Sequence, residues 1–441
     1  MFHQCEFLIM KKFPFIILAS LLLLTVVLNG CKKENEDKTG PEIEWIAPLA
    51  NTNFSFSNQI QVKVHVKEDT RLESVLVELI DENNASRLQQ LQFQNLTLHS
   101  DIVATLVHDD PYLPTGTYNI RVTASDGVNT SYAWREIHLT ELQRSLLHVY
   151  AVSENVSEQC RLDSIHSSGP MDAGQLDVKP DFSFLQSRHG IFTIASNSEN
   201  QIRNFDTAEL FLESSIDADP DGNDIITAAA ANHDHTEFYF GTANGEVWVY
   251  RESGLYTQAI SNSSTAPVRN LVISDQFIYV LTSNTVGNNE WMSVYVKSTG
   301  FLLHAIQLDL GVTGMIEVDD DHLLLSLNQE PESLVIYNNT TNNTNSIFTF
   351  YNQTPASGIW RGTNDNYYVM HQDGFTYYNT ALNNFVVHPE FNASDVRYEP
   401  LTGQLFIIGE NELTLASADL NNILESWTIP EIRNVLFEYN K

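Results

Sequence analysis

The sequence Ile278-Tyr279-Val280-Leu281-Thr282 is one copy of an element that recurs through the last 300 residues of the chain. It is a short run of apolar and aromatic residues that ends on a small or polar residue. Its counterparts include Phe238-Tyr239-Phe240-Gly241-Thr242 and Leu405-Phe406-Ile407-Ile408-Gly409, and further copies begin at Leu147, Phe192, Leu323 and Tyr367. Neighbouring copies start 38 to 46 residues apart. A spacing this regular predicts a row of similar structural units.

Each copy has the same kind of neighbours along the chain. A strand and a turn precede it, as in Val268 to Asp275, and two strands follow it, as in Ser293 to Lys297 and Phe301 to Leu308. The 3.6-residue period of helices is absent, which excludes a helical solenoid. Four short strands in each unit of about 43 residues predict an all-β fold of the β-propeller type.

The two ends of this region supply one unit between them. The segment Ile432 to Phe437 aligns with Val268 to Ile273, the opening strand of a unit. The strands that would complete it are available at Leu146 to Val152, Cys160 to Ile165 and Gln175 to Val178. We therefore predict that residues 142–441 form seven blades, closed into a ring by pairing of the N- and C-terminal strands.

The repeat resembles the YVTN or quinoprotein-type seven-bladed propellers, and Ile278 to Ser283 is nearest to their motif. The resemblance covers residues 146–441. The Trp-Asp dipeptide of WD40 repeats and the double glycines of kelch repeats are absent from the sequence. The resemblance implies a fold and carries no cofactor-binding residues over to this chain.

Residues 41–141 show a different pattern, in which apolar residues recur with a period of two. Ile60, Val62, Val64 and Val66 recur with period two, and about seven such short strands in a hundred residues predict a β-sandwich. The stretch from Leu113 to Tyr118 resembles the tyrosine-corner region of bacterial Ig-like and fibronectin-like modules. The resemblance implies an Ig-like domain, which we interpret as a spacer, with ligand binding by its loops as the alternative.

The first 31 residues have the composition of a targeting segment. Lys11 and Lys12 precede an apolar run that ends at Leu28-Asn29-Gly30-Cys31. The run is short for a membrane span, which favours a cleaved signal peptide over residues 1–30, with Met10 as an alternative start. Its ending resembles the lipobox of bacterial lipoproteins, which implies a lipid on Cys31. An uncleaved transmembrane anchor is the alternative.

Residues 31–40 are polar and charged, as expected of a tether. The lysines and acidic residues behind Cys31 resemble the export signal of Bacteroidetes-type lipoproteins. This resemblance implies an outer-membrane protein displayed on the cell surface, with the periplasmic face as the alternative.

The composition limits the classes of partner. With 23 Lys and Arg against 56 Asp and Glu, the formal net charge of the 441-residue chain is -33, which excludes a nucleic-acid partner held through its phosphates. Three cysteines exclude a disulfide scaffold and a four-cysteine zinc site. Only the N-terminal lipid is expected to contact a membrane.

An acidic loop is the clearest local motif in the repeat region. Asp217, Asp219, Asp221 and Asp224 alternate with other residues around Gly222, and this spacing can present several oxygens to a hard cation. The loop resembles the calcium loops of integrin-type propellers and EF-hands, although Pro220 departs from both patterns. Ca2+ is therefore the only predicted cofactor, and an acidic turn without metal is the alternative.

Binding residues are expected where the first strands of the units converge on the central channel. Arginines are scarce in this chain, and arginine and tryptophan beside a concave opening suit anionic or sugar ligands. For Trp360 we weigh packing between blades as an equal alternative. The residues placed at this mouth by the repeat alignment are Arg269, Thr313, Trp360, Arg361, Asp395, Arg397 and Arg433.

The sequence holds no nucleophile elbow, zinc-protease motif, P-loop or dinucleotide fingerprint, and no catalytic residues are predicted. We expect a lipid-anchored envelope protein that presents a propeller as a platform for a ligand or a protein. One alternative is an extracellular glycan-acting enzyme with carboxylates in the propeller cleft. The other is a scaffold subunit of an envelope complex.

Overall fold

The computed structural model describes residues 39–441, except for 218–224, 252–253, 255, 261–265, 284–289, 309–310, 329–331, 351–355, 364, 372–373, 383, 389–390, 392 and 441. The predicted signal peptide and Cys31 lie outside the described residues. All regular secondary structure in the described part is β-strand, which confirms the all-β class. Within that part, no helix has the length and apolar character needed to cross a membrane.

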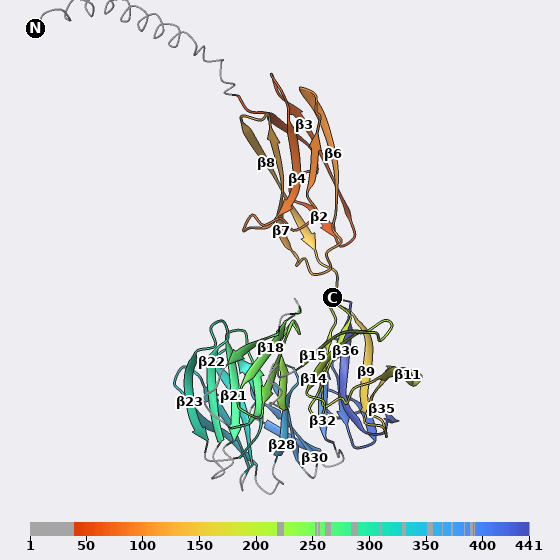
Figure 1. The fold of residues 1–441 in the computed structure, drawn as a ribbon, viewed down its shortest axis with the longest axis vertical. Coiled ribbons are helices and arrows are strands. Elements are labelled where there is room, and N and C mark those ends of the chain that lie inside the picture. The colour runs from red at the N-terminus through yellow and green to blue at the C-terminus, as the bar shows by residue number, and fades with distance from the viewer. Residues whose placement is uncertain are drawn as a thin grey trace, which may run out of the picture. The chain divides into compact units, whose positions relative to one another are not determined.

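The described residues separate into two compact units, one that ends at Gln143 and one that begins at Arg144. The first unit is a sandwich of two sheets (Figure 1). One sheet has the order β1-β3-β6 and the other the order β2-β8-β7-β4-β5. The strands are β1 (Glu42–Ala47), β2 (Thr52–Ser55), β3 (Gln59–Lys67), β4 (Ser74–Ile80), β5 (Leu91–Gln94), β6 (His99–Val107), β7 (Gly116–Ser125) and β8 (Thr130–Thr140).

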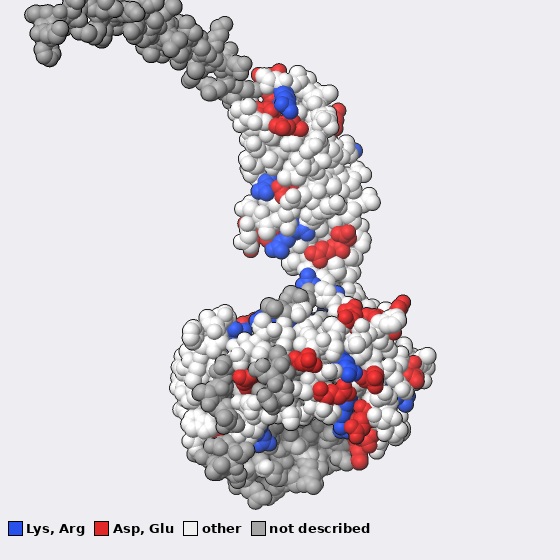
Figure 2. Space-filling view, viewed as in Figure 1, with Lys and Arg blue, Asp and Glu red and all other residues white. Residues whose placement is uncertain are grey.

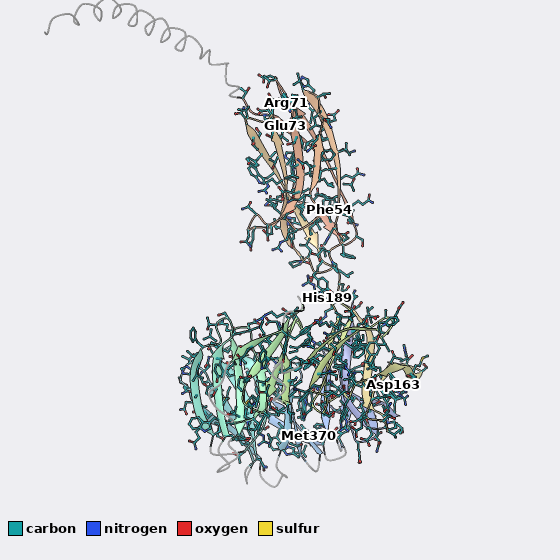
Figure 3. All side chains as sticks on the ribbon, in the orientation of Figure 1. Phe54, Arg71, Glu73, Asp163, His189 and Met370 are labelled. Carbon is teal, nitrogen blue, oxygen red and sulfur yellow. The ribbon has the colours of Figure 1, made fainter. Side chains whose placement is uncertain are left out.

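The core of the first unit follows directly from the alternation in its sequence. Every second residue of β3, from Ile60 to Val66, is fully buried against the inward-facing residues of β7 and the other strands. Phe54 of β2 packs on the same core (Figure 3). The Tyr118 hydroxyl donates a hydrogen bond to the Pro114 carbonyl oxygen at 2.9 Å, which is the contact expected of a tyrosine corner.

The loop after β4 contains a carboxylate with a pH-dependent role in stability. Asp81 accepts the Ala85 amide at 2.8 Å and the Arg87 Nε at 2.9 Å, and these donors hold the pKa of Asp81 below its usual value. The stabilisation is therefore complete above about pH 4 and is lost as the pH falls below it. We expect Asp81→Asn to lower the melting temperature of the first unit at pH 7, as measured by calorimetry. The difference between the melting temperatures of the parent and the variant should become smaller below pH 4. An equal difference at all pH values would instead indicate a loss of packing.

The second unit contains seven four-stranded sheets among its described residues. In six of them the four strands follow one another along the chain. These sheets are β12 (Phe182–Gln186), β13 (Ile191–Ser196), β14 (Gln201–Asp206) and β15 (Leu212–Asp217); β16 (Ile226–Ala231), β17 (Glu237–Thr242), β18 (Val247–Arg251) and β19 (Tyr256–Ile260); β20 (Val268–Ile273), β21 (Phe277–Ser283), β22 (Glu290–Val296) and β23 (Leu302–Leu308); β24 (Gly311–Asp319), β25 (His322–Asn328), β26 (Glu332–Asn338) and β27 (Asn343–Phe350); β28 (Ala356–Arg361), β29 (Asn366–His371), β30 (Gly374–Asn379) and β31 (Asn384–His388); and β32 (Asp395–Glu399), β33 (Gln404–Ile408), β34 (Glu412–Ser417) and β35 (Ile423–Thr428).

The remaining sheet joins the two ends of the unit, as the sequence predicts. Its order is β11 (Gly169–Leu176), β10 (Cys160–His166), β9 (Leu146–Glu154) and β36 (Ile432–Tyr439). Strand β36 pairs antiparallel with β9, with Val435 opposite Ala151 and Phe437 opposite Val149. The predicted closure by the last strand is therefore present.

The recurring apolar runs are the second strands of these sheets, and both faces of each run are buried. Phe238 and Phe240 of β17 pack toward the preceding sheet, whereas Tyr239 packs toward the following one. All three residues are almost fully buried. A strand covered on both faces has a continuous apolar sequence rather than an alternating one. This burial explains recurring runs such as Ile278 to Thr282.

Neighbouring first strands lie side by side and run in the same direction. Near their starts, Thr227 of β16 donates to the Val268 carbonyl of β20 at 2.6 Å. Near their ends, Arg361 of β28 donates to the Glu317 carbonyl of β24 at 3.3 Å. Strand β36 in turn contacts both β32 and β12. Sheets that pack face to face in this cyclic order form a propeller-type fold.

Candidate functional site

A cavity of about 200 Å³ lies among the first strands of four sheets, β12, β16, β32 and β36. Three of the predicted mouth residues line it, namely Asp395, Arg397 and Arg433. The other lining residues are Pro180, Asp181, Phe182, Ser183, Phe184, Ala229 and Asn434. The cavity therefore combines charged, amide, hydroxyl and aromatic groups.

Arg397 is held in place by two partners within the cavity. Its Nη2 forms an ion pair with Asp395 Oδ2 at 2.8 Å, and its Nε donates to Asn434 Oδ1 at 2.7 Å. The Asn434 amide in turn donates to the carbonyl and hydroxyl oxygens of Ser183, at 3.0 and 2.9 Å. This chain of hydrogen bonds joins β32, β36 and β12, so the cavity wall is rigid across three sheets.

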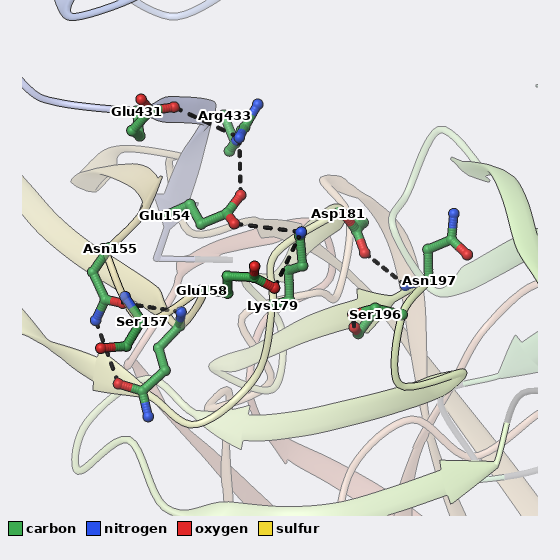
Figure 4. Close-up of polar contacts among 12 residues, drawn as sticks. Glu154, Asn155, Ser157, Glu158, Lys179, Asp181, Ser196, Asn197, Glu431 and Arg433 are labelled. Carbon is green, nitrogen blue, oxygen red and sulfur yellow. Dashed lines mark hydrogen bonds and ion pairs between the residues drawn. The ribbon is translucent and has the colours of Figure 1, made fainter.

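Arg433 belongs to an ion-pair network beside the cavity (Figure 4). Its Nη2 lies 2.9 Å from Glu154 Oε2 and 3.7 Å from Glu431 Oε2. Lys179 contacts the same Glu154 at 3.5 Å and Glu158 at 3.6 Å, and these carboxylates raise the pKa of Lys179. The network ties the last strand of the chain to β9 and to the segment before β12.

The charges that line the cavity compensate one another. The lining includes two arginines, Arg397 and Arg433, and two carboxylates, Asp181 and Asp395, and both arginines are already in ion pairs. The Asp181 carboxylate accepts the Asn197 amide at 2.7 Å. Phe182 and Phe184 add an apolar wall, and Phe184 stacks on Phe238 with ring centroids 4.8 Å apart. Such a site offers donors, acceptors and ring faces without an excess of either charge.

The other four predicted mouth residues lie outside this cavity. Arg269 pairs with Glu290 at 3.1 Å, and Thr313 exchanges a hydrogen bond with Ser326 at 2.9 Å. Trp360 packs between the β28–β31 and β32–β35 sheets. Arg361 stands with it at the end of β28, whereas Asp395 and Arg433 stand at the starts of their strands. The seven residues therefore do not form one site.

The repeat alignment missed the contributions of β12 and Asn434. The signal for Asn434 was present in the sequence, because it aligns with Asn270. The side-chain oxygen of each accepts the amide of the next residue at 2.8 Å, so the two asparagines hold the same local geometry. Phe182, Ser183 and Phe184 left no comparable signal.

The predicted calcium loop lies mostly outside the described residues. Asp217 ends β15 and accepts a hydrogen bond from Gln201 at 3.4 Å, whereas Asp219, Asp221 and Asp224 are not described. Within the described ranges no group of three metal-ligating side chains stands together. Calcium binding stays a prediction.

No family model and no curated protein matches the chain. Among solved structures it is similar to a quinoprotein alcohol dehydrogenase-like protein from Bacteroides thetaiotaomicron, with 11% identity, coverage of 90% of this chain and 99% of that one, and a TM-score of 0.47. It is also similar to Kuenenia stuttgartiensis hydrazine synthase, with 9% identity, coverage of 70% and 93%, and a TM-score of 0.49. A mitotic checkpoint complex chain gives 13% identity, coverage of 60% and 88%, and a TM-score of 0.46. Identities this low assign no ligand or reaction.

Proposed function

We propose that this chain is a cell-envelope protein, held to the membrane by a lipid on Cys31, whose propeller binds a neutral sugar or glycan in the cavity around Arg397. In the proposal the first unit is an Ig-like spacer and the second a complete seven-bladed propeller. The observation that carries the binding function is the meeting of two paired arginines, two carboxylates, an amide and two phenyl rings in one cavity.

The strand orders support the two fold assignments. In the first unit the β1-β3-β6 sheet corresponds to strands A, B and E of an Ig-like sandwich, and β8-β7-β4-β5 to G, F, C and C′. In the second unit each four-stranded sheet corresponds to one blade, and the closing sheet takes its first strand from β36.

The pairing of the arginines favours a neutral ligand over an anion. An anion would have to displace Asp395 from Arg397 or the two glutamates from Arg433. A sugar instead needs both donors and acceptors for its hydroxyl groups and an apolar surface for its ring carbons. The cavity volume of about 200 Å³ is the size of a single sugar residue rather than a long chain.

Binding is tested by titrating the full chain with a panel of neutral monosaccharides and disaccharides, followed by calorimetry. We expect at least tenfold weaker binding in Arg397→Ala and in Phe182→Ala, because each removes one type of contact. Arg71→Ala, which removes an exposed arginine of the first unit (Figure 3), is the matched control and should bind normally. Preferential binding of glucuronate or phosphate by the parent protein would contradict a neutral-sugar site.

Lipid anchoring is tested by Cys31→Ala. We expect the parent protein in the membrane fraction and the variant in the soluble fraction. An acyl chain contributes about 0.8 kcal/mol to the free energy of membrane binding for each CH2 group that it buries. Protease treatment of whole cells should remove the parent protein if it is displayed on the cell surface. A variant that still sediments with membranes would instead favour an uncleaved transmembrane anchor.

We also propose that the Asp217 to Asp224 loop binds calcium. A chelator should then lower the melting temperature of the second unit.

A scaffold subunit of an envelope complex is the second candidate function. It is favoured by apolar side chains that are exposed at the starts of the outermost strands of the sheets. These are Phe211 and Leu212, Phe301 to Leu303, Phe385 and Val386, and Ile423 and Leu424.

The two carboxylates that line the cavity, Asp181 and Asp395, are already engaged in a hydrogen bond and an ion pair, respectively. The cavity is therefore better suited to binding a ligand than to proton transfer.

A further inference from the structure

Two aromatic side chains stand exposed on the outer face of the first unit. Tyr132 and Trp134 of β8 are 52% and 53% exposed, although both carry large apolar rings. Their ring centroids lie 5.8 Å apart, with ring planes inclined by only 21°. Large exposed aromatic groups on an ordered strand are typical of binding surfaces.

The alternation of the strands fixes the face on which these rings lie. Ile137 and Leu139 of β8 point into the core of the unit, so residues of the other parity point outward. On β7 the inward residues include Ile120 and Val122, which leaves Arg121 and Thr123 on the outer face. Arg121 is opposite Trp134, and Thr123 is opposite Tyr132.

From the aromatic pair, two rows of side chains continue across the sheet. One row runs from Trp134 through Arg121 to Glu78 of β4, and the other from Tyr132 through Thr123 to Leu76 and then Gln92 of β5. Arg121 Nη2 lies 2.8 Å from Glu78 Oε1, and Gln90 donates to Glu78 Oε2 at 3.0 Å. The face therefore carries hydroxyl, amide and guanidinium groups whose charge is compensated.

We propose that this face of the first unit binds a neutral polysaccharide chain. The rings of Tyr132 and Trp134 would stack on the apolar C–H faces of sugar residues, while Thr123, Arg121 and Gln92 would meet their hydroxyl groups. The sheet is extended and ordered, so little conformational entropy is lost on binding. This surface is independent of the cavity in the second unit and gives the spacer a binding function of its own.

Charge complementarity distinguishes this ligand from the other candidates. Glu136, two residues beyond Trp134 on the same face, is exposed, and its carboxylate would be desolvated if the rings entered a lipid layer. The net charge of -33 opposes polyanions. An uncharged polymer with many hydroxyl groups satisfies both conditions.

The test is native affinity electrophoresis of the full chain in gels that contain a soluble β-glucan, an α-mannan, a galactan or, for comparison, a polyuronate. We expect at least one neutral polysaccharide to retard the protein. The apparent dissociation constant should rise at least tenfold in Trp134→Ala and in Tyr132→Ala, and less in Trp134→Phe. Val103→Ala, at an exposed position of β6 in the other sheet, is the matched control and should migrate like the parent.

Three results would overturn the proposal. They are the absence of retardation by every neutral polysaccharide, equal retardation of parent and aromatic variants, and ring-dependent binding to phosphatidylcholine vesicles in place of polysaccharide. Circular dichroism melting verifies that each variant is folded. Failure of the cavity proposal would be distinguishable, because it would appear only in the titrations with small sugars and in the Arg397→Ala variant.

Discussion

Removal of residues 432–441 is expected to abolish the cooperative unfolding transition of the second unit while the first unit remains folded. Strand β36 supplies the first strand of the sheet that contains β9, and it packs against β32, β33 and β12. Val435 and Leu436 of β36 are almost fully buried, so removal of the strand would expose the residues that pack against them. Burial of one such side chain contributes about 1.5 to 3 kcal/mol to the free energy of unfolding. The backbone hydrogen bonds between β36 and β9 contribute further. The sum approaches the total stability of a domain, about 5 to 15 kcal/mol.

Differential scanning calorimetry measures this directly. The parent chain should show a transition for each unit, whereas the truncated chain should keep only that of the first. Limited proteolysis should then degrade the second unit and spare the first. Ile423→Ser, at an exposed position of β35, is a control that alters the neighbouring sheet without affecting the closure. A truncated chain that retained both transitions would show that the sheets form a stable unit without β36.

The fold could be predicted from the sequence largely because burial on two faces leaves a visible record. Runs such as Phe238 to Phe240 are continuous because each residue packs against one of two neighbouring sheets. The closure could be predicted because Ile432 to Phe437 matches the opening strand of another unit. The acidic side chains on the surface over β9, β36 and β35 (Figure 2) do not help to predict the fold, because solvated side chains are weakly constrained by it.

The site was predictable only in part, because an alignment of repeats treats all units alike. It placed Arg269 and Arg433 at equivalent positions, yet only Arg433 lines the cavity. The difference arises from contacts between distant segments, such as Asn434 with Ser183, that no local pattern encodes. The aromatic face was hidden for a related reason. Apolar residues occur at both parities of β8, so its sequence does not reveal that Tyr132 and Trp134 point outward.

Substitution of Glu399 by alanine is expected to lower the free energy of unfolding of the second unit by about 3 kcal/mol. Each hydrogen bond to a charged group contributes about 1.5 to 3 kcal/mol. Water that binds the freed donors partly offsets the loss of these hydrogen bonds. Glu399 ends β32 and is fully buried. Its carboxylate accepts the Tyr439 hydroxyl at 2.9 Å, the Leu401 amide at 3.0 Å and the Thr402 amide at 2.6 Å. The residue therefore joins the end of the closing strand to the β32–β33 turn. Calorimetry should show the melting temperature of the second unit falling by roughly 5 to 10 °C, and a fall of less than 2 °C would contradict the role of this contact.

Tyr439, which donates a hydrogen bond to Glu399, has a pH-dependent role in the stability of the second unit. Burial and the neighbouring carboxylate raise the pKa of Tyr439, and the Arg144 guanidinium lies 3.8 Å from the centre of its ring. A raised pKa means that the stabilisation is complete below about pH 10, the ordinary tyrosine value, and is lost as the pH rises above it. Tyr439→Phe should therefore cost about 1 kcal/mol at pH 8, where the hydrogen bond is lost. Above pH 10 the stability of the Tyr439→Phe variant should fall less with rising pH than that of the parent, because the variant has no phenol at position 439 to ionise. If both proteins lost stability equally above pH 10, the alkaline transition would have to be assigned to the other buried tyrosines, of which Tyr150, Tyr239, Tyr279 and Tyr368 also have raised pKa values.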